Sequence, residues 1–212
     1  MTELRPIVYV IDDDPSMRAA LEDLVGSIGL QVRAFASPQE FLESKQADSP
    51  GCLVLDIRLP GMSGLSFQKE LVKAGLPLPV IFITGHGDIP MSVRAMKAGA
   101  VDFLTKPFHD QDLLDAIHAA IERDRDKRRE TLLITELRKR YETLTERERH
   151  IMGFVVAGRP NKQIAAELDL SEMTVKVHRG QVMRKMKARS LPELVRMSDT
   201  LGAALQASQS GA

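Results

Sequence analysis

The stretch "IVYVIDDDPSMR" (residues 7–18) runs from five apolar residues, most of them β-branched, directly into three adjacent aspartates. Such an apolar run is typical of a strand that is buried on both faces, and the Pro and Ser that follow favour the start of a helix. Adjacent carboxylates repel one another unless a cation lies among them. The stretch therefore predicts a strand, a loop with a cation site, and a helix.

The same alternation repeats along the first 121 residues. Strands are predicted at 7–11, 31–35, 52–56, 79–84 and 101–105, and helices at 15–28, 37–44, 63–74, 89–98 and from 110 onward. Strands that alternate with helices in this way are typical of an α/β fold, a doubly wound, five-stranded parallel sheet covered on both faces. In such sheets, ligands bind at the carboxyl ends of the strands.

The predicted strand ends carry polar groups that packing does not require. Asp12, Asp13 and Asp14 end the first strand, Asp56 ends the third, Thr84 ends the fourth, and Lys106 follows the fifth. Mg²⁺ is a hard cation that takes oxygen ligands, and it suits such carboxylates. An aspartate nucleophile, a metal ion, a lysine and a hydroxyl can together accept a phosphoryl group. A phosphoacceptor site is therefore predicted at this edge.

Composition sets the wider limits. The chain has 212 residues, a length comfortable for two domains, and a single cysteine. No apolar run approaches the ~20 residues that a membrane span needs, and the N-terminus lacks a signal peptide. We therefore expect a soluble, cytoplasmic protein with no membrane partner. Cys52 lies in the apolar run "CLVLD" and is expected in the core.

The net charge of the chain is zero, but its charged residues are distributed unevenly between the two parts of the sequence. Residues 1–121 hold 10 Lys and Arg against 16 Asp and Glu, whereas residues 122–212 hold 19 against 13. An acidic first part suits a divalent cation or a solvated surface, and a basic second part suits a polyanion. Two modules with different partners are therefore predicted.

Four stretches within residues 5–121 resemble the receiver domain of two-component response regulators. They are "VIDDDPSMR", "LVLDIRLPGMSG", "VIFITGHGD" and "AGAVDFLTKPF". The resemblance implies a flavodoxin-like receiver over residues 1–121, with Asp56 as the phosphoacceptor. It also implies a Mg²⁺ site formed by Asp12, Asp13, Asp56 and the backbone carbonyl of Arg58. Thr84 and Phe103 are the implied switch residues, Lys106 is the implied phosphate-pairing lysine, and the Lys106–Pro107 bond is expected to be cis.

Other interpretations of these residues stay open. Asp14 falls outside the implied set, and we expect it to cap the helix that follows. Asp12 and Asp13 could be first-turn acids of that helix, and Asp56 could cap the turn after its strand. Arg58 and His86 lie two residues after Asp56 and Thr84, where they are expected to tune the lifetime of the phosphoryl group.

Residues 122–142 are predicted to form a helical linker. The segment from residue 112 to residue 144 lacks Pro and Gly, which favours a continuous helix over a flexible hinge. Leu133, Leu137, Tyr141 and Leu144 follow at helical spacing. This seam could face a partner, or it could pack onto the protein's own second domain.

Residues 143–212 are predicted to form a small all-α domain. Thr145 and Glu148 make a capping box for one helix, and "NKQIAAELD" and "EMTVKVHRGQVMRKMK" follow as two helices joined by a tight turn. The second of these is basic, which describes a helix-turn-helix that enters the major groove of DNA. The segment also resembles the LuxR-type DNA-binding domain. That resemblance implies base contacts from Lys176 and Val177 and phosphate contacts from Lys162, Thr174, His178 and Arg179. The family often carries a longer side chain where Gly180 stands.

Together the two resemblances identify a FixJ-like DNA-binding response regulator, not an enzyme. They imply that a sensor histidine kinase phosphorylates Asp56 with Mg²⁺, and that the protein then dimerises and binds double-stranded promoter DNA to regulate transcription. RNA polymerase is a further candidate partner.

Two alternatives come from other readings of the receiver. "DDDPS" superficially fits the first motif of haloacid-dehalogenase-type phosphatases, but Ser92 stands where their later metal motif has Asp. Alternatively, the receiver is a dimerisation platform that works without phosphorylation.

Overall fold

The computed structural model describes residues 5–44, 48–76, 78–85 and 87–210, and for residues 204–210 it describes the backbone alone. The chain divides into two compact units, Met1–Arg128 and Arg129–Ala212. Among the described residues, no helix combines the length and the apolar character that a membrane crossing requires.

The first unit contains a five-stranded parallel sheet in the order β2-β1-β3-β4-β5. Its strands are β1 (Ile7–Ile11), β2 (Gln31–Phe35), β3 (Gly51–Asp56), β4 (Val80–Thr84) and β5 (Asp102–Thr105). The predicted fold class is confirmed, and each strand begins and ends within one residue of its predicted bounds. The strand order reverses between β1 and β3, and in such sheets this is the point where ligands bind.

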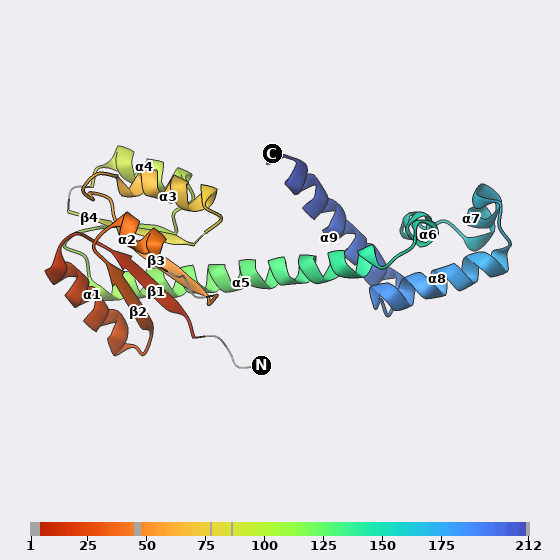
Figure 1. The fold of residues 1–212 in the computed structure, drawn as a ribbon, viewed down its shortest axis with the longest axis horizontal. Helices are drawn as coiled ribbons and strands as arrows, with labels where there is room; N and C mark the ends of the chain where they lie inside the picture. The colour runs from red at the N-terminus through yellow and green to blue at the C-terminus, as the bar shows by residue number, and fades with distance from the viewer. Residues whose placement is uncertain (1–4, 45–47, 77, 86, 211–212) are drawn as a thin grey trace. The chain divides into compact units, whose positions relative to one another are not determined.

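Helices cover both faces of this sheet (Figure 1). They are α1 (Pro15–Ser27), α2 (Pro38–Glu43), α3 (Gly64–Lys73), α4 (Ile89–Lys97) and α5 (Asp110–Glu142). Phe41 of α2, Phe67 of α3 and Ala95 of α4 belong to one core cluster, whereas Leu21 of α1 and Leu113 of α5 belong to the other. Successive residues of β1 point alternately into the two clusters, as the pleat of a strand requires.

Cys52 is fully buried in β3, as expected, and burial raises the pKa of its thiol. A close contact fixes the other end of the same strand. A Cβ atom on Gly64 would lie 2.6 Å from the carbonyl oxygen of Asp56, so only glycine lets α3 start this close to the strand end.

The predicted linker is helical, because α5 continues without a break to Glu142. Its middle is fastened to the first unit by Asp124, which is 4 % exposed. The Gly51 N–H donates to Asp124 Oδ2 at 3.0 Å, and Arg128 Nε donates to the same oxygen at 2.7 Å. Arg128 also bonds the exposed Asp48 at 2.8 Å. We refer to Asp124, Arg128 and Gly51 as the β3 clamp.

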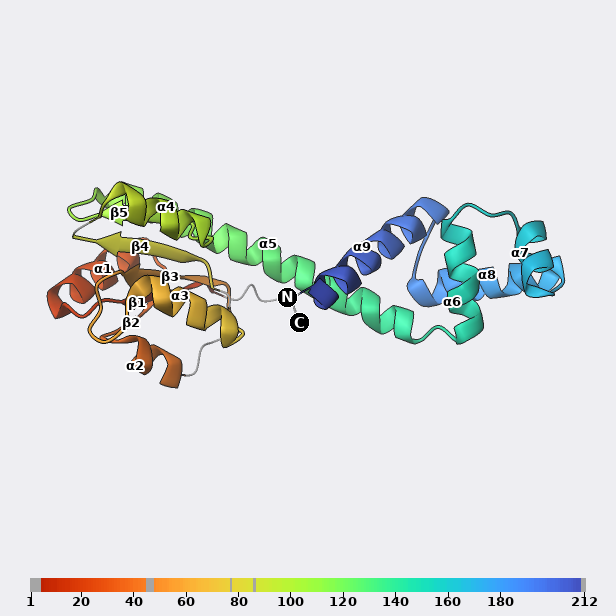
Figure 2. The same cartoon turned by 90° about the horizontal axis from the view of Figure 1, so that it is seen from above.

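The second unit adds α6 (Glu146–Val156), α7 (Asn161–Leu168), α8 (Glu172–Met186) and α9 (Leu191–Ser210). Contacts join α8 to both α6 and α7, and α6 to α9 (Figure 2). The predicted Thr145–Glu148 capping box is present, and Ser171 caps α8.

The apolar seam of α5 mostly joins the core of this second unit. Leu137 and Leu144 are buried there, and Tyr141 packs against them. Leu133 differs, because 54 % of it is exposed. Packing onto the protein's own second domain therefore accounts for three of the four seam residues.

Candidate functional site

Three carboxylates gather at the carboxyl ends of β1 and β3. Asp12, Asp13 and Asp56 each offer an oxygen, and these oxygens all lie within 4.8 Å of one another. Asp12 is 1 % exposed and Asp56 is 7 % exposed, whereas Asp13 lies at the surface. Because buried carboxylates are costly unless they are paired, this cluster requires positive charge.

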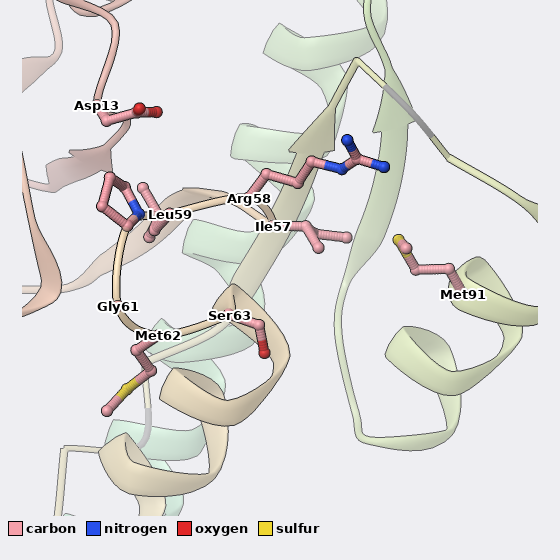
Figure 3. A pocket seen from close by; sticks show the side chains of 9 residues that line it. Asp13, Ile57, Arg58, Leu59, Gly61, Met62, Ser63 and Met91 are labelled. Carbon is pink, nitrogen blue, oxygen red and sulfur yellow. The ribbon is translucent and has the colours of Figure 1, made fainter.

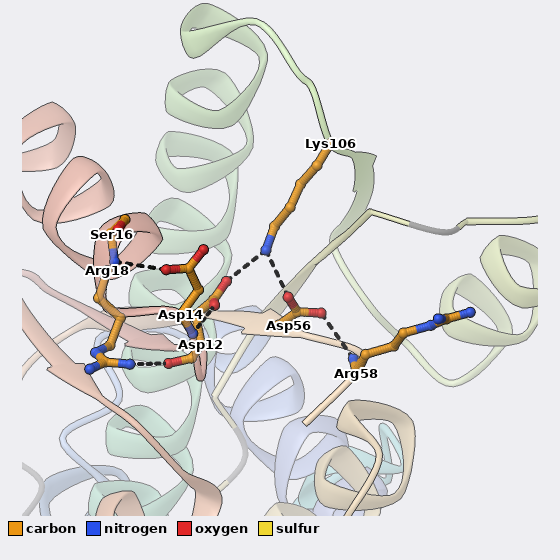
Figure 4. A network of polar contacts seen from close by, with 7 residues as sticks. All are labelled: Asp12, Asp14, Ser16, Arg18, Asp56, Arg58 and Lys106. Carbon is orange, nitrogen blue, oxygen red and sulfur yellow. Dashed lines mark hydrogen bonds and ion pairs between the residues drawn. The ribbon is translucent and has the colours of Figure 1, made fainter. Parts of the chain in front are cut away.

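Lys106 supplies part of that charge. Its Nζ lies 2.7 Å from Asp12 Oδ2 and 2.7 Å from Asp56 Oδ2, so that one ammonium bridges the two buried carboxylates (Figure 4). Lys106 follows β5, and its peptide bond to Pro107 is cis, as predicted. Three carboxylates and one lysine leave the cluster with a surplus of negative charge.

The pKa values of two groups show how the pair is balanced. Burial raises the pKa of Asp12, and hydrogen bonds from Lys106 and the Asp14 N–H only partly offset this, so the pKa lies above its ordinary value. Burial lowers the pKa of Lys106, but its bonds to Asp12 and Asp56 outweigh the effect and raise the pKa overall. The ammonium therefore keeps its proton.

The backbone orients both buried carboxylates. Asp12 Oδ1 accepts the Asp14 N–H at 2.9 Å, and Asp56 Oδ1 accepts the Arg58 N–H at 2.9 Å. Arg18 Nη1 donates to the carbonyl oxygen of Asp12 at 2.7 Å and so holds the loop after β1 in place. Sequence reasoning missed Arg18, because an arginine in the first turns of a helix carries no distinctive signal.

Asp14 is confirmed as a helix cap. Its Oδ1 accepts the Ser16 N–H at 2.8 Å, which satisfies a free donor at the start of α1. Its carboxylate lies outside the cluster of Asp12, Asp13 and Asp56.

The remaining predicted site residues line the neighbouring strands. Thr84 is fully buried at the end of β4, and its carbonyl oxygen accepts the Lys106 N–H at 2.8 Å. Phe103 lies on β5, and a Cβ on Gly87 would come within 2.9 Å of its ring, so glycine leaves room for the phenyl group. His86 falls outside the described residues.

An open pocket of about 630 Å³ adjoins the cluster. Its lining combines Asp13 with the loop after β3, Ile57 to Ser63, and Met91 of α4. Figure 3 shows the Arg58 side chain extending from this loop toward the Met91 side. Three hard oxygen donors beside open space suit Mg²⁺, which binds carboxylates while keeping several waters and taking phosphate oxygens.

In the second unit, α7 and α8 bring the six predicted DNA-binding residues onto two adjacent helices. Lys162, Lys176 and Val177 are exposed, whereas Thr174, His178 and Arg179 are half-buried. The Thr174 hydroxyl shares a 2.8 Å hydrogen bond with Ser171, and Arg179 Nη1 donates to Asn161 Oδ1 at 3.1 Å. Arg179 thus ties α8 to the first turn of α7.

Two family models match this chain. Residues 8–118 match the response regulator receiver domain, and residues 142–198 match the luxR family of bacterial regulatory proteins. The chain belongs to the response regulators. This two-component response regulator therefore combines a receiver domain with a LuxR-type DNA-binding domain, and the family favours that interpretation over a dehalogenase-type phosphatase.

The relatives of this response regulator match over both domains. Nodulation protein W of Bradyrhizobium diazoefficiens is 57 % identical over 198 residues, which cover 93 % of this chain and 87 % of the relative. The transcriptional regulatory protein FixJ of Azorhizobium caulinodans is 46 % identical over 197 residues, 93 % of each chain. The solved structure of the response regulator StyR has a TM-score of 0.83 and 45 % identity, and covers 92 % of this chain and 98 % of its own.

Proposed function

We propose that this response regulator accepts a phosphoryl group on Asp56 from a sensor histidine kinase, with Mg²⁺, and then dimerises and binds promoter DNA to regulate transcription. The observation that carries the proposal is the Lys106 bridge between the two buried carboxylates of a three-carboxylate cluster. A site that holds surplus negative charge next to a fixed ammonium is prepared for a cation and a phosphoryl group.

The chemistry of the transfer follows from these positions. An Asp56 carboxylate oxygen attacks the phosphorus of a phosphohistidine, the P–N bond breaks as the P–O bond forms, and the departing imidazole takes up a proton. Lys106, already bonded to Asp56 Oδ2, pairs with the charge that develops on the phosphoryl oxygens. Asp12, Asp13, Asp56 and the carbonyl of Arg58 would hold Mg²⁺, which neutralises further charge.

The switch that follows would involve Thr84 and Phe103. Thr84 ends β4, and its carbonyl oxygen already bonds the Lys106 N–H. We expect both side chains to shift when the phosphoryl group arrives and to remodel the surface formed by α4, β5 and α5. That surface carries exposed apolar side chains on α4, with Ile89 at 80 % and Met96 at 46 % exposure, which suits a dimer contact.

DNA binding would be the task of the second unit. The exposed basic side chains of α7 and α8 suit the DNA backbone, and α8 has the length and position of a recognition helix. The same proposal includes three domain boundaries, a cytoplasmic location and RNA polymerase as a partner. The domains are the receiver at 1–121, the helical linker at 122–142 and the DNA-binding domain at 143–212. Arg58, beside the acidic cluster, would help to set the lifetime of the phosphoryl group.

The test is intact mass after incubation with Mg²⁺ and acetyl phosphate, with oligomer size and DNA affinity measured on the same samples. We expect one phosphoryl adduct on the wild type and none on Asp56→Asn. Asp14→Asn is the matched control, because asparagine also caps a helix and Asp14 lies outside the cluster. It should gain the adduct as the wild type does.

Two outcomes would contradict the proposal. An adduct on Asp56→Asn would place the phosphoacceptor elsewhere. Tight DNA binding and dimerisation in the absence of any adduct would make the receiver a dimerisation platform that works without phosphorylation.

A further inference from the structure

The outward face of α8 is defined by the residues that the helix buries. Val175, Val182 and Met186 are fully buried and point into the core of the second unit. Successive residues of an α-helix are about 100° apart around its axis. Four positions of α8 lie within about 40° of the direction opposite to the buried residues, namely Met173, Val177, Gly180 and Arg184. These four positions form the ridge of the helix that is farthest from its own core.

The first three positions of this ridge offer no hydrogen-bond donor. Met173 is 67 % exposed and Val177 is 55 % exposed, and no other residue of α8 is an exposed large apolar side chain. A Cβ on Gly180 would meet nothing within 4 Å, so the third position is open space. Over its first two turns, the ridge therefore carries two apolar side chains and then a position that has no side chain.

The charged side chains of α8 nearest the ridge are basic, and Glu172, the one acidic residue of α8, lies about 120° around the helix from the ridge. Lys176 lies to one side of it, Arg184 ends it, and Lys162 is exposed on the neighbouring α7. Among the polar neighbours on the other side, Thr174 is engaged with the capping Ser171. An apolar strip with basic flanks is complementary to a groove with anionic walls, which favours DNA over a second protein surface as the occupant.

The major groove displays one large apolar feature, the C5-methyl group of thymine. Hydrogen-bonding side chains read the other edges of the bases, but the ridge has none at its centre. We propose that Met173 and Val177 read thymine methyl groups, and that Gly180 lets the helix backbone approach the bases closely. This inference rests on the proposed DNA-binding function and names the chemistry that the surface recognises.

The test uses the full-length chain, phosphorylated with acetyl phosphate, and a duplex selected by the wild type from random sequence. Each thymine is replaced in turn by deoxyuridine, which removes only the methyl group. At the thymines that the ridge contacts, we expect affinity to fall about fourfold per methyl group, as burial of a group of that size predicts. Methylating cytosine at C5 in place of such a thymine should recover part of the loss.

Variants assign the effect to the ridge. Met173→Ala with Val177→Ala should bind thymine and deoxyuridine duplexes almost equally, and both side chains are exposed, so the fold should be kept. Leu132→Ala is the matched control, because it removes an exposed apolar side chain of the same unit outside α8. It should retain the wild-type discrimination.

The outcomes separate this inference from the function on which it rests. If no duplex is selected, the proposed DNA binding itself fails. Sequence-specific binding with equal affinity for thymine and deoxyuridine overturns the inference alone. It is also overturned if the ridge variant keeps its discrimination, or if that variant loses self-association instead.

Discussion

The two ends of β3 carry similar groups with different balances of charge. At the amino end, the β3 clamp joins the buried carboxylate of Asp124 to the Arg128 guanidinium and the Gly51 N–H. At the carboxyl end, Asp56 accepts from the Lys106 ammonium and from the Arg58 N–H. Each end thus has a buried carboxylate, a cation and a backbone donor.

The difference lies in what surrounds each pair. In the clamp, one buried carboxylate meets one guanidinium, and the additional acid, Asp48, is fully solvated. At the carboxyl end, one lysine bridges the carboxylates of Asp12 and Asp56, and a third carboxylate, that of Asp13, lies beside them. Burial and pairing are common to both ends, so the surplus of negative charge is the feature that marks a binding site. A balanced cluster stabilises the fold, and an unbalanced one weakens it until a ligand binds.

The largest effect is expected at the clamp. Asp124→Ala leaves the buried Gly51 N–H without its acceptor and Arg128 without its main partner, which should cost about 1–3 kcal/mol of unfolding free energy. Urea unfolding of the full chain, with hydrogen exchange of β3 to identify the first unit, measures the change. Glu122→Ala, which removes an exposed partner of Arg125, is the control and should cost far less. Equal losses for both variants would refute a structural role for the clamp.

At the carboxyl end of β3, where negative charge is in surplus, removal of a carboxylate is expected to raise the free energy of unfolding instead of lowering it. Asp13→Asn removes one of the surplus carboxylates, so that without Mg²⁺ the first unit should gain about 1 kcal/mol from the lost repulsion. Mg²⁺ should then stabilise the wild type but stabilise the variant much less, because a ligand carboxylate is missing. Thermal unfolding with and without Mg²⁺ measures both effects. A destabilised variant that still responds fully to Mg²⁺ would break the comparison.

The unbalanced end was predictable from the sequence, and the clamp was not. Asp12, Asp13, Asp56 and Lys106 each end or follow a predicted strand, and parallel topology brings such positions to one edge. Asp124 lies in the charged run "ERDRDKRRE", where it looks the same as its exposed neighbours. Which of these acids is buried depends on the contact with the start of β3, and that strand lies far away in the sequence.

Prediction from the sequence has the same limit in the second unit. The capping residues Thr145, Glu148 and Ser171 follow local rules, so the starts of α6 and α8 can be predicted from the sequence. The bond between Arg179 and Asn161 depends on how α7 packs against α8, and the family resemblance, which implies a phosphate contact for Arg179, does not reveal it. Tertiary packing decides which basic residues stay exposed.

The smallest effect is expected at a third cluster, which is balanced like the clamp. Glu148 is 5 % exposed, and its Oε2 accepts from Lys185 Nζ at 2.6 Å and from the Thr145 N–H at 2.7 Å. Burial alone would raise the pKa of Glu148, but the bonds from Lys185 and Thr145 outweigh it and lower the pKa below its ordinary value of 4.5.

A lowered pKa in the folded state means that the unfolded chain binds the proton more tightly. The stabilisation by Glu148 is therefore complete above the ordinary pKa and is lost as the pH falls through the lower, folded-state value. In Glu148→Gln an amide oxygen can still accept from Lys185 and the Thr145 N–H, so only the charge of the pair is lost, which should cost about 0.5 kcal/mol. The stability difference between the wild type and Glu148→Gln, followed by hydrogen exchange of α6, should shrink over this acid range. If the wild type instead gained stability relative to Glu148→Gln as the pH falls, Glu148 would carry surplus charge, as the carboxylates around Asp56 do.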